Sequence, residues 1–310
     1  MKFTTLGNTT LEVSMFCIGG QSFGTRDKED VAYPVLDQYA DAGGNFLDTS
    51  NMYATWMGEG GESETLLGHW MKQRQNRDRM IVASKVGFAA KDAPQSTRAE
   101  DIVRECERSL KRLQTDHIDL YYAHRDDRHV PLEEQLGAFD DMVKSGKVRY
   151  IGASNFKAWR LAEAAGVSAA QDISSFCCVQ QRHTYLRPRV DADFDFQTSC
   201  NGDLLEYCAS RNLPLLAYSP LLSGAYGRDD RRIPAQYLHA DSDARLAVLH
   251  AVAKETGSTA NQVILAWLTG QDIIPITGAS TLEQLAESLT GFDLTLSQSQ
   301  IKNLNEAGEA

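Results

Sequence analysis

The sequence predicts an α/β protein that folds as a (β/α)8 TIM barrel, and three observations lead to this prediction. Short apolar runs recur along the chain, they lack the in–out alternation of half-exposed strands, and amphipathic helical windows separate them. Parallel strands buried on both faces produce such continuous apolar runs. The predicted strands are residues 15–20, 45–50, 80–84, 118–123, 148–154, 175–180, 213–219 and 272–278.

The rival architecture is an open, doubly wound parallel sheet. That fold usually places a G-x-G-x-x-G phosphate-binding turn after its first strand. Residues 19–24 read Gly-Gly-Gln-Ser-Phe-Gly, which does not match, and the fingerprint occurs nowhere else in the chain. Strands that alternate with helices throughout the chain therefore favour the closed barrel, built from right-handed crossovers.

The ends of several helices can be predicted from local signals. The window 28–42 is expected to be helical and to stop at residues 43–44, a Gly-Gly pair, with Pro34 either in its first turn or bending it. The window 97–113 carries an apolar stripe with helical period, which predicts an amphipathic helix packed on the barrel.

Two capping boxes are predicted at helix starts. Thr97 followed by Glu100 has the spacing that satisfies orphan backbone N–H groups at the start of the 97–113 helix. Thr259 and Gln262 have the same spacing and predict a second capped helix, which should end before Gly270.

The segments outside the barrel strands predict a cap and two long loops. Phe3–Thr5 and Leu11–Val13 flank a Gly-Asn turn, which predicts a short N-terminal hairpin closing the barrel bottom. No linker or composition shift divides the chain, so we expect one domain over residues 1–310. Residues 186–202 and 221–241 should be long loops after the sixth and seventh strands, where barrels usually carry function.

Composition excludes several classes of protein. The net charge is −11, and no dense Lys/Arg block suggests binding to nucleic acid or to an anionic membrane. No apolar run is long enough to span a bilayer, and the N-terminus lacks the core of a signal peptide. The six cysteines form no CxxC pair and no zinc-finger spacing. We therefore expect a cytoplasmic protein with neither structural disulfides nor a metal site.

Titratable residues gather where three successive predicted strands end. Asp48 ends the second strand, and Tyr53 follows five residues later. Lys85 ends the third strand and His124 the fourth. Active-site groups of barrels come from these carboxyl ends and from the loops after them. The sequence therefore predicts that the four side chains meet at one site.

The chemistry of this set suggests proton transfer to a carbonyl oxygen. A nearby ammonium from Lys85 would favour the phenolate of Tyr53 and make its hydroxyl a better acid, with Asp48 as the counter-charge. His124 would hydrogen-bond the substrate oxygen. Together these groups would protonate an alkoxide as hydride arrives from a cofactor. None of them is a covalent nucleophile with its own base, which argues against acyl transfer.

At these residues the chain resembles the aldo-keto reductase family. The segment Asp-Thr-Ser-Asn-Met-Tyr at 48–53 is similar to the family's D-T-A-x-x-Y signature. Further matches follow in the family's order and cover the chain end to end. They are residues 61–64, 84–87, 118–124, 146–156, 217–221 and 274–280.

The resemblance implies roles for individual residues. Asp48, Tyr53, Lys85 and His124 would form the catalytic tetrad, with Tyr53 as general acid in reduction and base in oxidation. Ser154, Asn155 and Gln180 would hold the nicotinamide carboxamide, and Tyr218 would stack on the ring. The other implied cofactor-binding residues are Gly20, then Ser219, Leu221, Ser223 and Gly224 along the pyrophosphate, and Gly278, Ser280, Gln284, Glu287 and Ser288 around the adenosine end.

Some positions depart from the family's pattern. Gln180 aligns with the family glutamine, but a one-residue slip would put Gln181 there instead. Arg182 and His183 replace an acid and an aromatic residue, and Arg125 replaces an aromatic residue after the histidine of the tetrad. Lesser departures are Ala225 for a lysine and Ser288 for an asparagine.

The expected cofactor is NADPH, with NADH as the alternative. Gln284 stands where many relatives that grip the extra phosphate of NADP have an arginine, and a 2′-phosphate normally requires Arg or Lys. Trp56 is expected to wall the substrate site, with incidental packing as the alternative.

The sequence thus predicts an NAD(P)H-dependent oxidoreductase that acts on a small-molecule carbonyl or alcohol. The long loops hint at a sugar-like substrate. Two alternatives stay open: a nicotinamide-binding interaction module with little turnover, and a Schiff-base aldolase that uses Lys85. We expect a monomer or a small homo-oligomer, without nucleic-acid or membrane partners.

Overall fold

The structure, a computed structural model, describes residues 1–308 and contains a closed barrel of eight parallel strands, as the sequence predicts. Neighbouring strands follow one another in chain order, and β10 closes the ring by pairing with β9 and β3. Residues 309–310 of the predicted domain lie outside the described residues. The barrel strands are β3 (Cys17–Gly19), β4 (Phe46–Asp48), β5 (Ile81–Val86), β6 (Ile118–Ala123), β7 (Val148–Ser154), β8 (Val179–Arg182), β9 (Leu215–Tyr218) and β10 (Ile274–Thr277).

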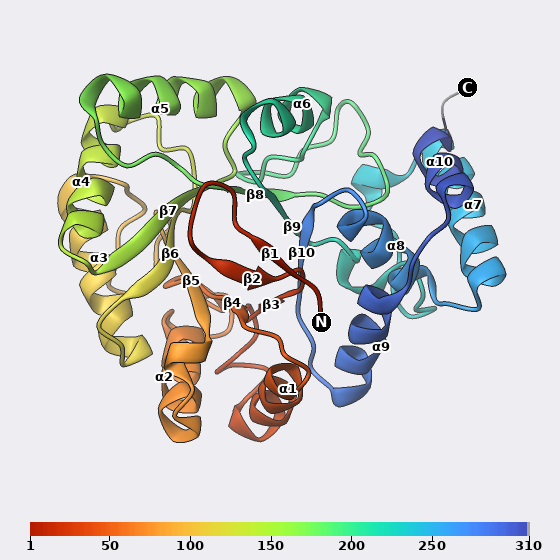
Figure 1. Ribbon diagram of the computed structural model, residues 1–310, viewed down its shortest axis with the longest axis horizontal. Helices are drawn as coiled ribbons and strands as arrows, with labels where there is room; N and C mark the ends of the chain where they lie inside the picture. The colour runs from red at the N-terminus through yellow and green to blue at the C-terminus, as the bar shows by residue number, and fades with distance from the viewer. Residues whose placement is uncertain (309–310) are drawn as a thin grey trace.

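Helices surround the barrel and form its outer layer (Figure 1). Within residues 1–308, one α-helix follows each barrel strand up to β8, and two follow each of β9 and β10. They are α1 (Glu29–Asp41), α2 (Glu62–Arg74), α3 (Ala99–Leu113), α4 (Leu132–Lys144), α5 (Ala158–Gln171), α6 (Gly202–Arg211), α7 (Ala240–Thr256), α8 (Ala260–Thr269), α9 (Leu282–Asp293) and α10 (Gln298–Glu306). Short 3-10 turns lie at Arg77–Arg79, Leu222–Gly224 and Ala235–Tyr237.

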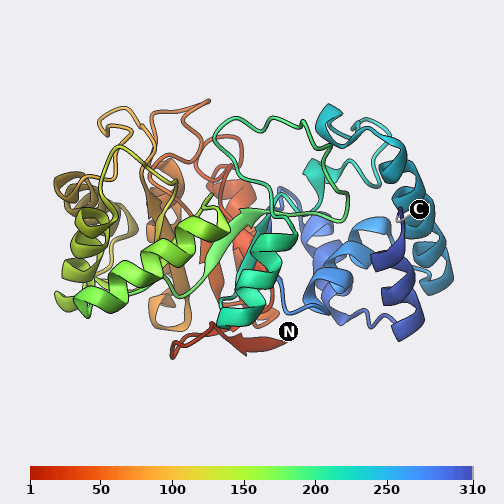
Figure 2. The same ribbon diagram turned by 90° about the horizontal axis from the view of Figure 1, so that it is seen from above.

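The predicted hairpin closes the amino-terminal end of the barrel. Strands β1 (Phe3–Thr5) and β2 (Glu12–Ser14) pair in antiparallel, so the second arm begins one residue later than predicted. Leu6, Leu11 and Val13 are fully buried and join the cluster of side chains inside the barrel. Figure 2 shows the hairpin on one side of the barrel and the long loops on the opposite side.

Side chains alternate across each barrel strand between two separate apolar clusters. On β4, Phe46 belongs to the inner cluster and Leu47 to the outer cluster beneath the helices. On β6, Leu120 and Tyr122 face inward and Tyr121 outward. Because both faces are covered, the strands read as continuous apolar runs in the sequence. The same period of two decides which residues at the strand ends face the barrel axis.

The sixth barrel strand lies further along the chain than predicted. β8 covers Val179–Arg182, whereas the apolar run suggested 175–180. Its register with β9 continues to the pair Arg182 and Tyr218, so hydrogen bonding carries the strand past the apolar residues into polar ones. The predicted loop at 221–241 contains two 3-10 turns and the first residues of α7.

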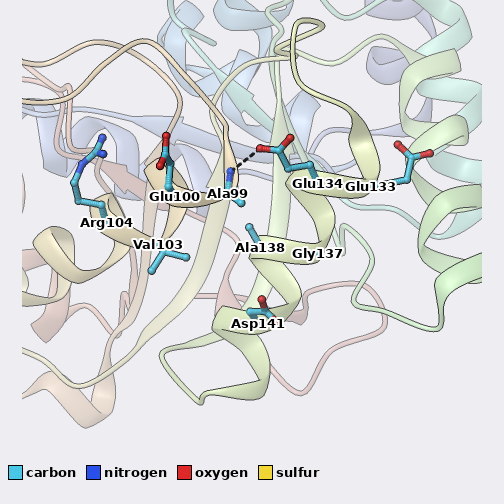
Figure 3. A pocket seen from close by; sticks show the side chains of 9 residues that line it. All are labelled: Ala99, Glu100, Val103, Arg104, Glu133, Glu134, Gly137, Ala138 and Asp141. Carbon is cyan, nitrogen blue, oxygen red and sulfur yellow. Dashed lines mark hydrogen bonds between the residues drawn. The ribbon is translucent and has the colours of Figure 1, made fainter.

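The capping prediction is wrong at α3 and confirmed at α8. Helix α3 begins at Ala99 after Arg98, and neither forms a side-chain cap. Instead Glu134 of α4 accepts a hydrogen bond from the Ala99 N–H at 3.1 Å, and both residues line an open pocket of about 630 Å³ between the two helices (Figure 3). The backbone N–H of Thr97 donates to Asp127, so Thr97 belongs to the preceding loop. At α8, by contrast, Thr259 forms its predicted capping box.

Helix α1 runs through Pro34, its sixth residue, and stops at the predicted glycine pair. Gly43 has a φ of +87°, which ends the helix in the left-handed region. Gly44 is required for a different reason, because a Cβ at this position would lie 2.3 Å from the ring of Tyr39. The helix stop and the packing of Tyr39 are therefore set together.

Tyr39 ties α1 to the first two barrel strands. Its side chain is fully buried, and its hydroxyl donates to the Phe16 carbonyl at 2.6 Å and accepts from the Phe46 N–H at 3.0 Å. Ser14 lies 2.9 Å from the same oxygen. The hydroxyl thus hydrogen-bonds backbone groups where β3 and β4 begin.

Replacing Tyr39 with phenylalanine should destabilise the protein by about 2 kcal/mol, because the buried Phe46 N–H loses the hydroxyl as acceptor and the Phe16 carbonyl keeps only the Ser14 hydroxyl as donor. The midpoint of urea unfolding should fall while the slope stays constant. Tyr33→Phe on the same helix is the matched control, because Tyr33 is only partly buried. Equal losses in the two variants would contradict the role given to the Tyr39 hydroxyl.

Candidate active site

The four predicted tetrad residues meet at the carboxyl ends of three adjacent strands. Asp48 lies two residues beyond the inward-facing Phe46 on β4, and Lys85 lies two beyond the inward-facing Ala83 on β5. His124 bears the same relation to Tyr122 on β6. Because side chains alternate between the two faces of a strand, the inward-facing positions of each strand continue into the site.

Lys85 is the centre of a closed hydrogen-bond network. It is fully buried, and its ammonium contacts the Asp48 carboxylate, the Tyr53 hydroxyl and the Thr49 carbonyl, each at 2.7 Å. An ammonium has three donors, so all of them have partners. The Tyr53 hydroxyl in turn donates to Asp48 Oδ2 at 2.8 Å. The buried charge is thereby both paired and hydrogen-bonded, as burial requires.

The environment keeps the Tyr53 phenol protonated. Burial raises the pKa of Tyr53 well above its ordinary value, and the adjacent Asp48 carboxylate raises it further. The expectation that Lys85 would pull Tyr53 towards phenolate is therefore wrong for this state, because burial and Asp48 outweigh the ammonium. Burial lowers the pKa of Lys85, while Asp48 opposes that shift.

His124 is a neutral imidazole at the edge of this network. Burial lowers the pKa of His124 well below its ordinary value, and the Lys85 charge lowers it further. Its Nδ1 lies 3.3 Å from Ser50 Oγ, and its ring is 6.0 Å from the ring of Tyr53 between centroids. In residues 1–308 its Nε2 has no hydrogen-bond partner, which leaves that nitrogen for a substrate.

The residues predicted to hold a carboxamide occupy the next strand ends. Asn155 follows β7 with a left-handed φ of 63°, and its amide is tied on both sides. Its Nδ2 donates to the His124 carbonyl at 2.9 Å and to Ser154 Oγ at 3.1 Å, and its Oδ1 accepts from the Tyr218 hydroxyl at 2.7 Å. Asn155 therefore fixes Ser154, Tyr218 and the backbone of His124 relative to one another.

Gln180 faces the barrel axis and Gln181 faces away from it. Gln180 Nε2 donates to Asp48 Oδ1 at 2.8 Å, which joins it to the tetrad. Gln181 instead contacts the backbone beside β7, accepting from the Asn155 N–H and donating to the Phe156 carbonyl. Adjacent residues of a strand point to opposite faces, so only Gln180 reaches the interior.

The loop after β9 carries unusual backbone conformations. Ser219, Leu222, Ser223 and Gly224 all have positive φ, with values of 54°, 46°, 58° and 87°. Three of these are not glycine, and such residues persist in the left-handed region only where their surroundings impose it. This loop includes the predicted pyrophosphate residues, among them Leu221, and begins directly beside the Tyr218 ring.

At the start of α9, Ser280 is bound by a pair of residues that the sequence did not reveal. Arg26, in the loop after β3, donates to Ser280 Oγ at 2.7 Å, and Ser280 Oγ donates to Asp27 at 2.8 Å. Burial would raise the pKa of Asp27, but its hydrogen bonds lower it on balance. Gln284 accepts from the Ser280 N–H at 2.8 Å. Barrel closure between β10 and β3 brings these distant segments together.

The remaining predicted cofactor residues are less directly arranged around the site. Gly20 is explained by packing, since a Cβ there would lie 2.7 Å from Ser63 Oγ. Glu287 accepts from the Thr259 hydroxyl at 2.7 Å, which links α9 to the start of α8. Gly278 is exposed and Ser288 is buried.

Two departures from the family pattern have structural roles away from the tetrad. Arg182 donates to the Tyr237 hydroxyl at 3.1 Å and to Gln197 at 2.6 Å, and so joins the two long loops. His183 packs against Trp267 with 5.9 Å between ring centroids and the rings tilted by 33°. Burial lowers the pKa of His183 to about 4, and Arg245 adds to the effect. His183 therefore adds no charge near the barrel mouth at neutral pH.

An aromatic wall beside His124 was not predicted. The ring of Phe88 lies 4.8 Å from the imidazole and 4.5 Å from the ring of Phe196, between centroids. Phe196 comes from the long loop at 186–202, so that loop reaches the carboxyl end of the barrel. Trp56 is 56% exposed and is not among these contacts, which leaves its predicted role as a proposal. Sequence reasoning missed Phe88 because an aromatic residue two positions after a strand gives no distinctive signal.

Within residues 1–308, no three His, Cys, Asp or Glu side chains are arranged to hold a metal ion. All six cysteines are free thiols. None of the helices described has the length and apolarity needed to cross a membrane.

The chain is similar to known proteins over its whole length. A family model described as the aldo/keto reductase family matches residues 16–309. The uncharacterized oxidoreductase YrpG of Bacillus subtilis is 31% identical over 99% of this chain and 95% of its own length. The aldo-keto reductase yakc [NADP(+)] of Schizosaccharomyces pombe is 30% identical over 97% and 90%.

Two further relatives extend the comparison. The norsolorinic acid reductase of Aspergillus flavus is 28% identical over 96% of this chain and 78% of its own length. A crystal structure of the thermostable aldo-keto reductase Tm1743, in complex with the inhibitor epalrestat, superposes with a TM-score of 0.79. It covers 99% of both chains at 28% identity. The similarity therefore extends to both the sequence and the fold.

His183 should make the protein acid-sensitive. Its pKa is about 4 in the folded state and about 6.5 when unfolded, so the unfolded chain binds a proton that the folded chain does not. Its contribution is fully present above pH 6.5 and declines as the pH falls towards 4. Allowing for partial exposure of the ring, we expect a loss of about 2 kcal/mol.

The measurement is urea unfolding at several pH values between 7 and 4. His183→Gln should lose less stability over this interval than the parent protein. His250→Gln, at an exposed position on α7, is the control and should behave as the parent does. If the two variants show the same pH dependence, His183 is not the source of the effect.

Proposed function

The chain belongs to the aldo/keto reductase family of oxidoreductases, and from this premise we propose that it interconverts an aldehyde or ketone and the corresponding alcohol. The reaction would proceed by direct hydride transfer to or from a nicotinamide cofactor, with Tyr53 handling the proton. The single observation that carries this proposal is the buried network in which a protonated phenol lies between Lys85 and Asp48.

The side chains around the barrel mouth fit a nicotinamide. The Ser154 hydroxyl accepts from Asn155 and, in residues 1–308, has no acceptor for its own proton. Gln180 must turn its NH2 towards Asp48, which leaves Oε1 without a partner in the same residues. A carboxamide has a carbonyl oxygen that could accept from the Ser154 hydroxyl and an NH2 group that could donate to Gln180 Oε1. Tyr218 supplies an aromatic face beside them.

A bound nicotinamide supplies the hydride, and the chain's own residues orient the substrate and move the proton. In reduction, the Tyr53 hydroxyl turns from Asp48 to the carbonyl oxygen and protonates it as negative charge develops there. Neutral His124 donates to the same oxygen when its proton is on Nε2. Lys85 keeps its ammonium beside Tyr53 and stabilises the phenolate left behind. In oxidation the proton moves in the opposite direction.

We infer that the cofactor is NADPH, with NADH as the alternative. The support is the usual preference of the family for NADP(H) and the name of the yeast relative, which specifies NADP(+). Gln284 provides no positive charge, but Arg26 stands beside Ser280 at the start of α9. A 2′-phosphate at the start of α9 would contact the guanidinium of Arg26, which comes from the loop after the neighbouring strand β3. Asp27 shares that guanidinium, so the attraction is weaker than that of an unpaired arginine.

The two other functions left open by the sequence receive no support from the site. An aldolase lysine needs a free amine, whereas Lys85 has three hydrogen-bond partners. An interaction module would not require a complete proton-transfer network. We propose that the whole chain acts as one domain on a small carbonyl or alcohol. The free cysteines are consistent with a cytoplasmic location.

Replacing Tyr53 with phenylalanine should lower kcat for aldehyde reduction by about 10³-fold, because general acid catalysis typically contributes on this scale. NADPH affinity, followed by quenching of protein fluorescence, should change little. Tyr150→Phe is the control, because the Tyr150 hydroxyl bonds Thr10 of the hairpin at the opposite end of the barrel. A Tyr53→Phe variant that reduced aldehydes at the parent rate would refute the acid assignment.

Replacing Arg26 with alanine should raise the Kd for NADPH by about 10-fold, as expected for one charged hydrogen bond to a phosphate. The Kd for NADH should change less than about 2-fold. Arg74→Ala is the control, because Arg74 pairs with Asp37 on the outer helices. Equal losses for the two cofactors would mean that Arg26 acts only through the position of Ser280.

A further inference from the structure

Arg125 stands directly after His124 and is unusual among the arginines near the barrel mouth. Its side chain is partly buried, and its guanidinium carbon lies 5.5 Å from the centre of the Phe88 ring. Among residues 1–308 it has no carboxylate and no hydrogen-bond partner. By contrast, Arg26 pairs with Asp27, and Arg182 donates to Gln197.

The acidic side chains nearest in sequence are already bound elsewhere. Asp126 accepts from Arg128 at 3.0 Å and from Arg160 at 2.9 Å. Asp127 accepts from the backbone N–H groups of Thr97 and His129. The loop after β6 therefore contains two carboxylates and still leaves the guanidinium of Arg125 uncompensated.

The charge balance of the site makes this guanidinium distinctive. Lys85 is neutralised by Asp48, and the lowered pKa of His124 keeps its imidazole uncharged. Arg125 is thus the uncompensated cation next to the tetrad in the described residues. The chain as a whole carries a net charge of −11, so a local positive group is needed to favour an anionic ligand.

The surroundings of Arg125 indicate the rest of the ligand. Phe88 contacts both the imidazole of His124 and the guanidinium of Arg125, so both groups lie beside the same aromatic ring. Phe196 extends the apolar wall and is 46% exposed. A flat apolar body laid against this wall would place a carbonyl near His124 and an anion near Arg125.

We propose that the substrate carries a carboxylate, joined to its reacting carbonyl through an apolar or aromatic spacer, and that Arg125 binds this carboxylate. The proposal rests on the reductase function proposed above and adds the substrate class to it. Arg125 would act as a specificity-determining residue, because a guanidinium matches a carboxylate with two parallel hydrogen bonds. Tyr53 and His124 would remain the groups that act on the carbonyl.

The test uses two substrates that differ only in charge, 4-formylbenzoate and its methyl ester, with the protein and NADPH. The acid should have a kcat/KM about 10-fold or more above that of the ester. In Arg125→Met this preference should disappear through a higher KM for the acid, with the ester unchanged. Arg125→Lys should keep part of the preference, because the charge remains while the planar fork is lost. Arg128→Met is the matched control and should leave the preference intact.

Two kinetic outcomes would overturn the proposal. The first is an equal kcat/KM for acid and ester in the parent protein. The second is an equal loss for both substrates in Arg125→Met, which would mean that Arg125 only packs against Phe88. Unchanged turnover of the ester by Arg125→Met also shows that this variant is folded.

A binding measurement separates this proposal from the proposed function. Calorimetric titration of 4-formylbenzoate into Tyr53→Phe and into the double variant Tyr53→Phe/Arg125→Met requires no turnover. We expect about 10-fold weaker binding in the double variant. If the parent turned over neither substrate while this difference held, the reductase assignment would fail and the carboxylate site would stand. Equal binding by the two variants would refute the site whatever the turnover.

Discussion

The buried contact between Lys85 and Asp48 is the interaction on which the rest of the site depends. An ammonium without water is tolerated only when charge and hydrogen bonds replace hydration, and Asp48, Thr49 and Tyr53 supply these. Removing any of these partners leaves a buried charge poorly satisfied. The geometry is thus strongly constrained, because β4 and β5 must pair so that Asp48 and Lys85 point into the same space.

The barrel imposes this constraint because side chains alternate between the two faces of each strand. The same alternation explains why much of the fold and the convergence of the tetrad could be predicted from the sequence. Buried parallel strands leave long apolar runs, and their polar ends stand out against them. Phe46 and Asp48 lie on one row, as do Ala83 and Lys85, so knowing the strand ends was enough to predict the convergence. The same rule distinguishes inward Gln180 from outward Gln181 once the true bounds of β8 are known.

What the sequence did not predict depends on contacts between distant segments. The spacing of Thr97 and Glu100 matches a capping box, yet Glu134 from the neighbouring helix takes that place. Arg26 reaches Ser280 only because β10 closes on β3. The direction of the Tyr53 pKa was also misjudged. Residue types revealed the ammonium nearby, while the degree of burial and the contact with Asp48 are properties of the folded chain.

The raised pKa of Tyr53 is compatible with its proposed role as an acid, because the hydrogen bond to Asp48 belongs to the state without substrate. That bond is one of the causes that raise the pKa, after burial and the Asp48 charge. When the hydroxyl turns to a substrate oxygen, the bond is lost while the ammonium of Lys85 stays in contact. The phenol then becomes easier to ionise at the moment the alkoxide needs a proton. Tyr53 can therefore stay firmly protonated while it donates to Asp48, and it can give up its proton when it donates to the substrate oxygen.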